Sequence, residues 1–258
     1  MAAMALLVAL PARAAEVISS NTVGYSRLEI KPGLNMIAMP FIDLERDQNG
    51  KVQNKEINGL FDNDADVVNA NRNSIAADQM WVWDAAEQKY INYYYMTDRK
   101  NSSYRWENDE GTFEGLQEPV GAGFFFQNKG EETYRITLSG EVNMEDTIIN
   151  ILPGLNFISN PYPIDLPLND GSIDWTNANA NRNSIQADQM WFWDASEQTY
   201  NNFYYMTDRK NTYYRWENDA GEFDGVAIPA YTGFFYNYKG EGTGFTLTLK
   251  NPVANTGN

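Results

Sequence analysis

A long internal repeat of uneven quality is the feature of this chain that most constrains its fold. Residues 69–111 recur at residues 179–221, a constant offset of 110 positions, with 34 identities over 43 aligned residues. The flanks of the repeat agree less well, since Leu28–Phe41 and Ile149–Tyr162 share 7 of 14 residues. Uniform drift after a duplication leaves equal similarity everywhere, so the central segment has either been held fixed or been copied by gene conversion. Two copies of one surface predict a module that binds or assembles twice. We call residues 69–111 and 179–221 the fixed segments.

The repeat divides the 258 residues into two units of about 110 residues, an ordinary domain size. The chain is rich in Tyr (16), Phe (13) and Trp (7), and Asn is also abundant, which favours strands joined by polar turns. Alternating runs such as Met80–Trp83, with both Trp on one face, predict seven or eight short strands per repeat. We therefore expect an all-β chain of two tandem repeats, each a β-sandwich or barrel, over residues 15–142 and 143–258. The first repeat carries 11 extra residues between Phe41 and Asn69.

The charge and the missing residue types exclude several functions. The net charge of −16 opposes binding to nucleic acids and anionic lipids. Because the chain has neither Cys nor His, disulfides, thiol chemistry, zinc ribbons and His-based catalytic triads are all excluded. Carboxylates such as Asp78, Asp84, Glu107 and Asp109 remain as acid–base candidates, but they recur in both repeats and no pair stands out. We expect no enzymatic activity.

The N-terminus predicts export. Ala2–Leu10 is an apolar run too short to span a bilayer, and Ala12-Arg13-Ala14 follows it with the small-residue pattern of a cleavage site. These features indicate a signal peptide over residues 1–14 and a mature chain that begins at Ala15. The alternative is a plain N-terminal extension. We expect an extracellular or cell-surface protein without a membrane span.

The turn and core motifs resemble those of tandem β-repeat proteins exported by environmental Gram-negative bacteria. The motifs are Val23-Gly24-Tyr25, Pro32-Gly33-Leu34-Asn35, the Trp-rich hairpin, Gly121-Ala122-Gly123-Phe124-Phe125 and Ser139-Gly140-Glu141-Val142. The second copy departs from them, because Tyr231 and Thr232 replace the first Gly–Ala pair and no Gly-Glu-Val follows Leu249. The resemblance covers nearly all of the mature chain. It implies an exported β-rich fold and no particular activity.

One acidic segment resembles the calcium loop of EF-hand proteins. Glu45, Asp47, Asn49 and Glu56 take the spacing of the oxygen ligands, and Gly50 stands where that loop turns sharply. The departures are Glu45 in place of Asp and the absence of flanking helical patterns. The alternative interpretation is an acidic surface hairpin around Asn49-Gly50. Calcium is the only cofactor that the sequence suggests, and this site would exist in the first repeat alone.

The aromatic residues of the fixed segments are candidates for a glycan-binding or assembly surface. Sugar rings pack on aromatic faces while polar and charged side chains bind the hydroxyls. The candidate residues are Trp81, Trp83, Tyr94, Arg99 and Trp106 with their copies Trp191, Trp193, Tyr204, Arg209 and Trp216. The alternative is that most of these rings are core. Tyr93-Tyr94-Tyr95 must face both sides of its strand, so a partner protein, the sister repeat or a glycan is expected to cover the outer side.

Two polar loops of the fixed segments recur unchanged in the second repeat. They are Asn69–Ile75 and Asp98–Asn101, and their identity indicates either a functional surface or local turn chemistry. Two hypotheses for the whole chain follow. The first is a structural protein that self-associates into a filament or layer, with Glu16–Tyr25 adding as a strand to a neighbour. The second is a carbohydrate-binding protein with two equivalent aromatic sites.

Overall fold

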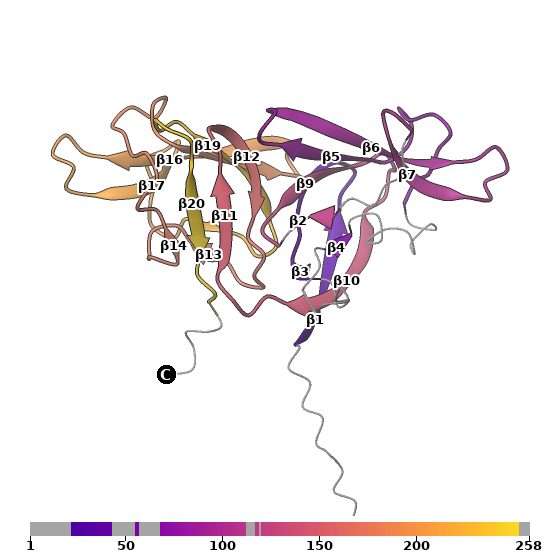
Figure 1. Ribbon diagram of the computed structural model, residues 1–258, viewed down its shortest axis with the longest axis horizontal. Coiled ribbons are helices and arrows are strands. Elements are labelled where there is room, and N and C mark those ends of the chain that lie inside the picture. Colours follow the sequence, from indigo (N-terminus) through magenta and orange to yellow (C-terminus); the bar gives the residue numbers. More distant parts are fainter. Residues whose placement is uncertain (1–21, 43–54, 57–67, 112–116, 119, 253–258) are drawn as a thin grey trace, which may run out of the picture.

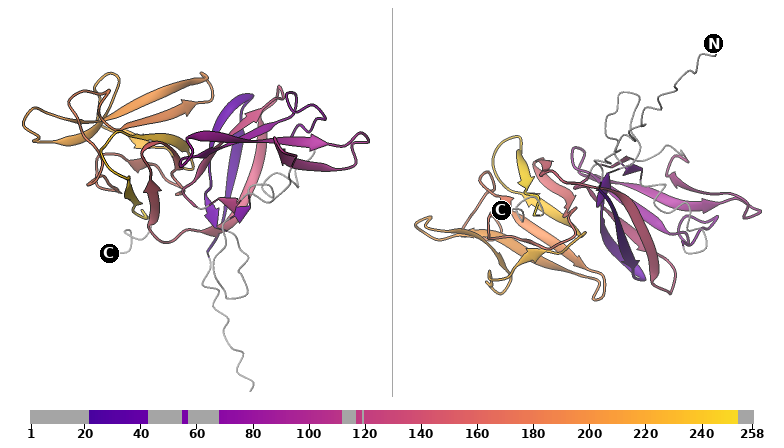
Figure 2. Two further views of the ribbon diagram at one scale, coloured as in Figure 1. Left: turned by 45° about the horizontal axis from the view of Figure 1, so that its top comes forward. Right: turned by 90° about the horizontal axis from the view of Figure 1, so that it is seen from below.

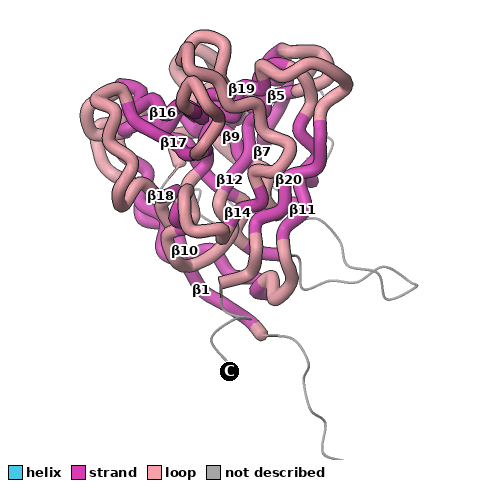
Figure 3. Tube along the Cα trace, turned by 90° about the vertical axis from the view of Figure 1, so that its left-hand side faces the viewer, coloured by secondary structure: helices cyan, strands magenta, loops and turns pink. Residues whose placement is uncertain are grey.

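The chain folds entirely into β-strands and loops. The computed structural model describes residues 22–42, 55–56, 68–111, 117–118 and 120–252, and within these ranges it contains no helix (Figure 3). The predicted all-β class is therefore confirmed. The candidate signal peptide, the ligands Glu45, Asp47 and Asn49 of the candidate calcium loop, and most of the extra residues after Phe41 lie outside the described residues. Glu56 belongs to a short strand.

The first half of the chain contains strands β1 to β10 and forms one lobe of the molecule (Figure 1). The strands are β1 (Val23–Ile30), β2 (Gly33–Ala38), β3 (Phe41–Ile42), β4 (Lys55–Glu56), β5 (Gln79–Asp84), β6 (Lys89–Thr97), β7 (Tyr104–Asn108), β8 (Gln117–Glu118), β9 (Gly123–Asn128) and β10 (Tyr134–Val142). They form a five-stranded antiparallel sheet in the order β2-β9-β5-β6-β7, a three-stranded sheet β1-β10-β3 and the pair β4-β8.

The second half repeats the strand order of the five-stranded sheet in a second lobe beside the first (Figure 2). Its strands are β11 (Thr147–Ile151), β12 (Gly154–Ser159), β13 (Leu166–Pro167), β14 (Ile173–Asp174), β15 (Gln189–Asp194), β16 (Thr199–Thr207), β17 (Tyr214–Asn218), β18 (Ala227–Ile228), β19 (Gly233–Tyr238) and β20 (Phe245–Leu249). The sheets run β12-β19-β15-β16-β17, β11-β20-β14 and β13-β18. The hairpin ends of β6–β7 and β16–β17 point away from each other at opposite ends of the molecule (Figure 1).

Each fixed segment supplies three adjacent strands at one side of its five-stranded sheet. They are β5, β6 and β7 in the first half and β15, β16 and β17 in the second. The turn after β5 forms because the Asp84 carboxylate accepts hydrogen bonds from the amides of Ala86 and Glu87 at 3.0 and 3.1 Å. Gln88 then takes a left-handed backbone conformation, φ 51°, which lets the chain reverse into β6. The resulting register pairs Trp81 with Asn92, so side chains alternate between two faces along both strands.

One face of each five-stranded sheet packs on the smaller sheet of its own half. In the first half Met80, Phe124 and Phe126 of the large sheet meet Ile136 and Leu138 of β10, all at most 4% exposed. The second half builds its core in the same way, with Met190, Phe234 and Tyr236 against Leu247 and Leu249. Each half is therefore a small two-layer β-structure, and the second face of each large sheet is left for other contacts.

Strand β1 places part of the N-terminal segment in a sheet of its own chain. Val23 and Tyr25 pair with Glu141 and Ser139 of β10, and the addition of this segment to a neighbouring molecule stays a prediction. Among the described strands β1 is the edge of its sheet. Tyr25 is 75% exposed there. The rest of the predicted donor segment, residues 16–21, lies outside the described residues.

Candidate binding surface

The second faces of the two large sheets pack against each other around three phenylalanines. Phe125 of β9, Phe157 of β12 and Phe235 of β19 are at most 7% exposed. Their ring centroids are 5.0 Å apart for Phe125–Phe157 and 4.7 Å apart for Phe157–Phe235. Trp83 packs edge-on against Phe235 of the other half at 5.8 Å. The contact is therefore an aromatic core between the halves.

The polar contacts between the halves are reciprocal. The indole Nε1 of Trp83 donates to the carbonyl of Leu155 at 2.8 Å, and Trp193 donates to the carbonyl of Leu34 at 2.7 Å. In the same way the Gln88 amide donates to the Leu155 carbonyl and accepts from the Leu155 N–H, both at 2.9 Å. Gln198 makes the matching pair with Leu34 at 3.1 Å for each bond. The halves thus meet through a pseudo-two-fold contact.

This contact also seals two exposed strand edges. Strands β2 and β12 are the edges of the five-stranded sheets, where unpaired backbone groups promote unwanted pairing. The glutamine side chains satisfy the free groups of Leu34 and Leu155 as a neighbouring strand would. The fit is close, because a Cβ added at Gly154 would lie 2.6 Å from the Gln88 Oε1 atom. Gly33 and Gly154 also have φ values of 90° and 86°, which glycine adopts without strain.

Four of the predicted site residues belong to this contact. Trp81, Trp83, Trp191 and Trp193 are partly buried and pack on the aromatic core between the halves. A partner protein, the sister repeat and a glycan were the three alternatives for what covers the outer side of the hairpin. The sister repeat covers the part that carries these four rings. The sister half therefore covers part of these four rings, and a glycan platform on their remaining surface stays a prediction.

Two other predicted site residues are core. Trp106 and Trp216 are 0% exposed. Trp106 lies 5.0 Å from the Tyr95 ring and Trp216 lies 5.2 Å from the Tyr205 ring, centroid to centroid. Because both indoles are enclosed within their own halves, neither stacks on a ligand. The expectation of a surface role for them is wrong.

The differences between the strands of the two fixed segments all lie on one face of the sheet. In β5–β7 the side chains on the face that turns toward the other half, here called the outer face, follow from the register. They are Gln79, Trp81, Trp83, Tyr90, Asn92, Tyr94, Met96, Arg105 and Glu107, and every one is identical in β15–β17. The positions that differ are Val82, Lys89, Ile91 and Tyr93, which all have the opposite orientation. Cores usually vary less than surfaces, so this reversed pattern marks the outer face as the constrained one.

The outer face continues beyond the contact between the halves. Its distal part, Asn92, Tyr94, Met96, Arg105 and Glu107, makes none of the hydrogen bonds or ring contacts between the halves described above, and each residue is partly or largely exposed. The Tyr94 hydroxyl donates to Asp109 at 2.8 Å, and Tyr204 repeats this with Asp219 at 2.8 Å. Arg105 pairs with Glu107, as Arg215 does with Glu217 at 2.7 Å. Partial desolvation and the bond to Asp109 raise the pKa of Tyr94.

The polar loops are explained largely by local turn chemistry. The Asn71 and Asn73 side chains accept from the amides of Asn73 and Ile75 at 3.0 and 3.1 Å. The Asp98 carboxylate accepts from the Ser102 amide and hydroxyl, both at 2.7 Å, and these bonds lower its pKa. The second half repeats these bonds through Asn181, Asn183 and Asp208. Arg99 and Arg209 are exposed beside these turns.

Asp78 and Asp188 are buried anchors. Both are 0% exposed, and burial raises the pKa of each carboxyl. Asp78 accepts backbone N–H bonds from Lys129 at 2.6 Å and Asn69 at 2.7 Å, which ties the loop before β5 to the turn after β9. A carboxylate enclosed by backbone donors cannot reach a substrate. Asp78, one of the acid–base candidates, therefore has a structural role.

The described residues contain no cluster of metal-binding side chains and no membrane-spanning helix. Within them no three acidic side chains gather closely enough to hold an ion, and the candidate calcium loop falls outside them. Across those same ranges the structure has no helix of the length and hydrophobicity that a membrane crossing requires. Comparison with protein-family models, curated proteins and solved structures finds no match for this chain.

Proposed function

We propose that this protein is an exported, non-enzymatic structural subunit that associates with copies of itself at the cell surface or in the extracellular matrix. The observation that carries the proposal is the identity of the whole outer face in two halves that differ elsewhere. The contact between the halves explains why the outer-face residues that belong to it, such as Trp81 and Trp83, are identical. It does not explain the identity of the distal part, which a partner surface shared by both halves does explain.

The chemistry of the distal outer face suits a protein partner. Tyr, Met and Arg, which protein interfaces favour, occupy its centre. Arg105 forms an ion pair with Glu107 within the face, and the Asp109 carboxylate accepts a hydrogen bond from the neutral Tyr94 hydroxyl. A face with nearly balanced charge can meet its own copy although the chain as a whole carries −16.

The placement of the two faces favours an open polymer. The hairpins that carry them extend toward opposite ends of the molecule (Figure 1). A subunit with one contact at each end joins two neighbours, and such contacts grow into a filament unless the rotation between subunits closes a ring. The open edge of β1, with Tyr25 exposed, offers lateral pairing between filaments.

Concentration-dependent assembly of the mature chain tests the proposal. We expect ordered filaments or layers by negative-stain electron microscopy from the chain that begins at Ala15. Met96→Glu combined with Met206→Glu places an unpaired charge in the centre of each face and should leave monomers. Thr137→Glu combined with Thr246→Glu adds the same charge at exposed positions of the smaller sheets and should assemble normally. Monomers of the wild-type chain at every concentration would contradict the proposal.

A chelator arm of the same experiment tests calcium. If the segment from Glu45 to Glu56 holds calcium that assembly needs, chelation should dissolve the assemblies. Assemblies that persist in chelator remove calcium from the proposal and leave self-association in place.

A further inference from the structure

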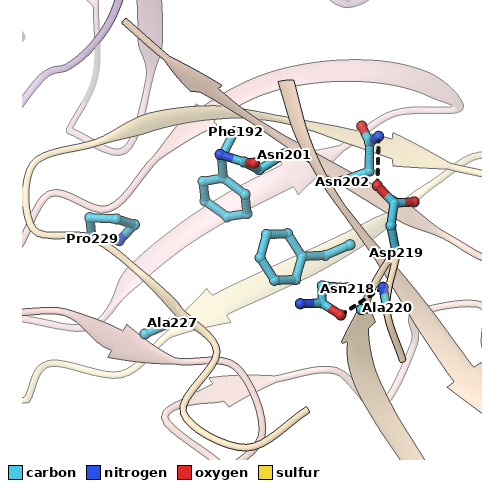
Figure 4. A pocket seen from close by; sticks show the side chains of 9 residues that line it. Phe192, Asn201, Asn202, Asn218, Asp219, Ala220, Ala227 and Pro229 are labelled. Carbon is cyan, nitrogen blue, oxygen red and sulfur yellow. Dashed lines mark hydrogen bonds between the residues drawn. The ribbon is translucent and has the colours of Figure 1, made fainter. Parts of the chain in front are cut away.

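The second half contains a pocket on the opposite side of its large sheet from the outer face. It has a volume of about 360 Å³ and lies between the strands β15–β17 and the segment around β18. Figure 4 shows Phe192 and Asn201 at one side, with Pro229 and Ala227 across from Asn202 and Asp219. This size lies at the small end of the range for ligand pockets, roughly 300–1,000 Å³.

The aromatic wall of the pocket is held rigidly. Phe192 is 7% exposed and stacks on Phe234 of the core, with ring centroids 5.1 Å apart and planes 22° apart. Phe203 packs edge-on against Phe192 at 5.3 Å. The aromatic wall therefore does not need to rearrange when a ligand binds, which limits the entropy cost of binding.

The polar groups on the rim are also positioned in advance. The Asp219 carboxylate accepts from the Asn202 amide at 3.2 Å and from the Tyr204 hydroxyl at 2.8 Å, so its orientation is fixed. Asn218 is held by the amide of Ala220 at 3.0 Å. The Asn201 side chain, in contrast, makes no hydrogen bond to the described part of the chain and is exposed to solvent. Its amide offers both donors and an acceptor to a ligand.

The two fixed segments differ most where this pocket lies. Four of their nine differences line it, because Phe192, Asn201, Phe203 and Ala220 stand where the first half has Val82, Ile91, Tyr93 and Glu110. The exchange supplies an amide in place of a hydrocarbon side chain and removes a carboxylate from the rim. Scattered drift does not concentrate changes in this way. The second half is therefore specialised at this place.

We propose that this pocket binds a neutral saccharide. Aromatic rings accommodate the C–H face of a sugar ring, while amides and one carboxylate bind its hydroxyl groups. The lining residues include no Lys or Arg, and the chain is strongly acidic, so phosphate-bearing and uronic-acid ligands are disfavoured. The site differs from the paired aromatic platform expected from the sequence.

Saturation-transfer NMR on the mature chain tests the site. The probes are cellotetraose, xylotetraose and mannotetraose, with trigalacturonate as the anionic comparison. We expect at least one neutral probe to bind and the anionic probe to bind at least tenfold more weakly. No signal from any neutral probe at millimolar concentration overturns the proposal.

Exchanging single residues between the halves supplies matched variants. Asn201→Ile and Ala220→Glu install the residues of the first half, so the fold tolerates them, and each should weaken the neutral probe at least tenfold. Thr199→Lys is also an exchange between halves, but it lies outside the pocket and should leave binding unchanged. Wild-type affinity in both pocket variants, or equal loss in all three, overturns the assignment.

Discussion

The hydroxyl of Tyr236 on β19 donates a 2.5 Å hydrogen bond to the buried carboxylate of Asp188. In the first half the matching residue of β9 is Phe126, and Tyr134 of β10 supplies the phenol to Asp78 instead. Strand pairing places Tyr134 opposite Ile30 as it places Phe245 opposite Ile151. The hydroxyl therefore comes from the ring on β10 in the first half and from the ring on β19 in the second half. Each buried carboxylate keeps a phenol donor.

Removing this hydroxyl should destabilise the second half. Tyr236→Phe leaves a buried charged acceptor with one donor fewer, which costs about 1–3 kcal/mol. Adding Phe245→Tyr recreates the arrangement of the first half and should recover part of the loss. Urea denaturation of both variants measures the effect. Equal stability of Tyr236→Phe and the wild type would show that the bond contributes nothing.

The buried carboxyl should give a measurable pH dependence. Because burial raises the pKa of Asp188 above its unfolded value, the folded state binds the proton more tightly, and the contribution of Asp188 to stability falls as pH rises through that interval. Asp188→Asn removes this titration. The destabilisation caused by Asp188→Asn should therefore grow as the pH is lowered through this interval.

Unfolding curves for the wild type and Asp188→Asn at several pH values give this difference directly. Asp208 is the control, because bonds from Thr212 lower its pKa and the sign reverses. A destabilisation by Asp188→Asn that shrinks as pH falls would contradict the assignment of a raised pKa.

The glutamine clamps should stabilise the contact between the halves. Gln88→Ala leaves both the N–H and the carbonyl of Leu155 without the side chain that now satisfies them. Trp83 keeps one bond to that carbonyl, so we expect a loss of about 1–2 kcal/mol. Glu87→Ala, at the exposed neighbouring position of the same turn, is the control and should be neutral. Thermal unfolding checks both variants.

Phe125 and Phe235 should be energetically coupled across the halves. Their ring centroids are 5.9 Å apart, and a double-mutant cycle with alanine should give an interaction energy of about 0.5–3 kcal/mol. Phe124→Ala and Phe234→Ala remove equally buried rings from two separate cores. Those two losses should add within about 0.5 kcal/mol. Additive losses for the first pair as well would show that the halves fold without mutual support.

The hairpins were predictable because their signals are local. Alternation in Met80–Trp83 and Tyr90–Met96, with a polar turn between them, matches β5 and β6 closely. The shared face of Trp81 and Trp83 is also confirmed. Alternation identifies which residues share a face, but it does not say what covers that face. For this reason the sequence left the sister half, a partner and a glycan as open alternatives.

Trp106 and Gln88 show what the sequence could not reveal. The short run Tyr104–Asn108 has too few residues to assign Trp106 to the core, and only its pairing with Tyr95 places it there. Gln88 looks like an ordinary turn residue, because its bonds are made to Leu155, 67 positions away. The pocket beside Asn201 depends on the approach of β18, which no local pattern indicates.

The reciprocal contact between the halves has a consequence for how the chain recognises itself. The surface that each half offers is nearly the same, so its chemistry does not distinguish the sister half from a half of another molecule. The short connection over residues 143–146 makes the choice, because tethering gives the sister half a far higher effective concentration. Once chains are crowded to that concentration, halves can trade partners, and a run of such exchanges links one molecule to the next without any new surface.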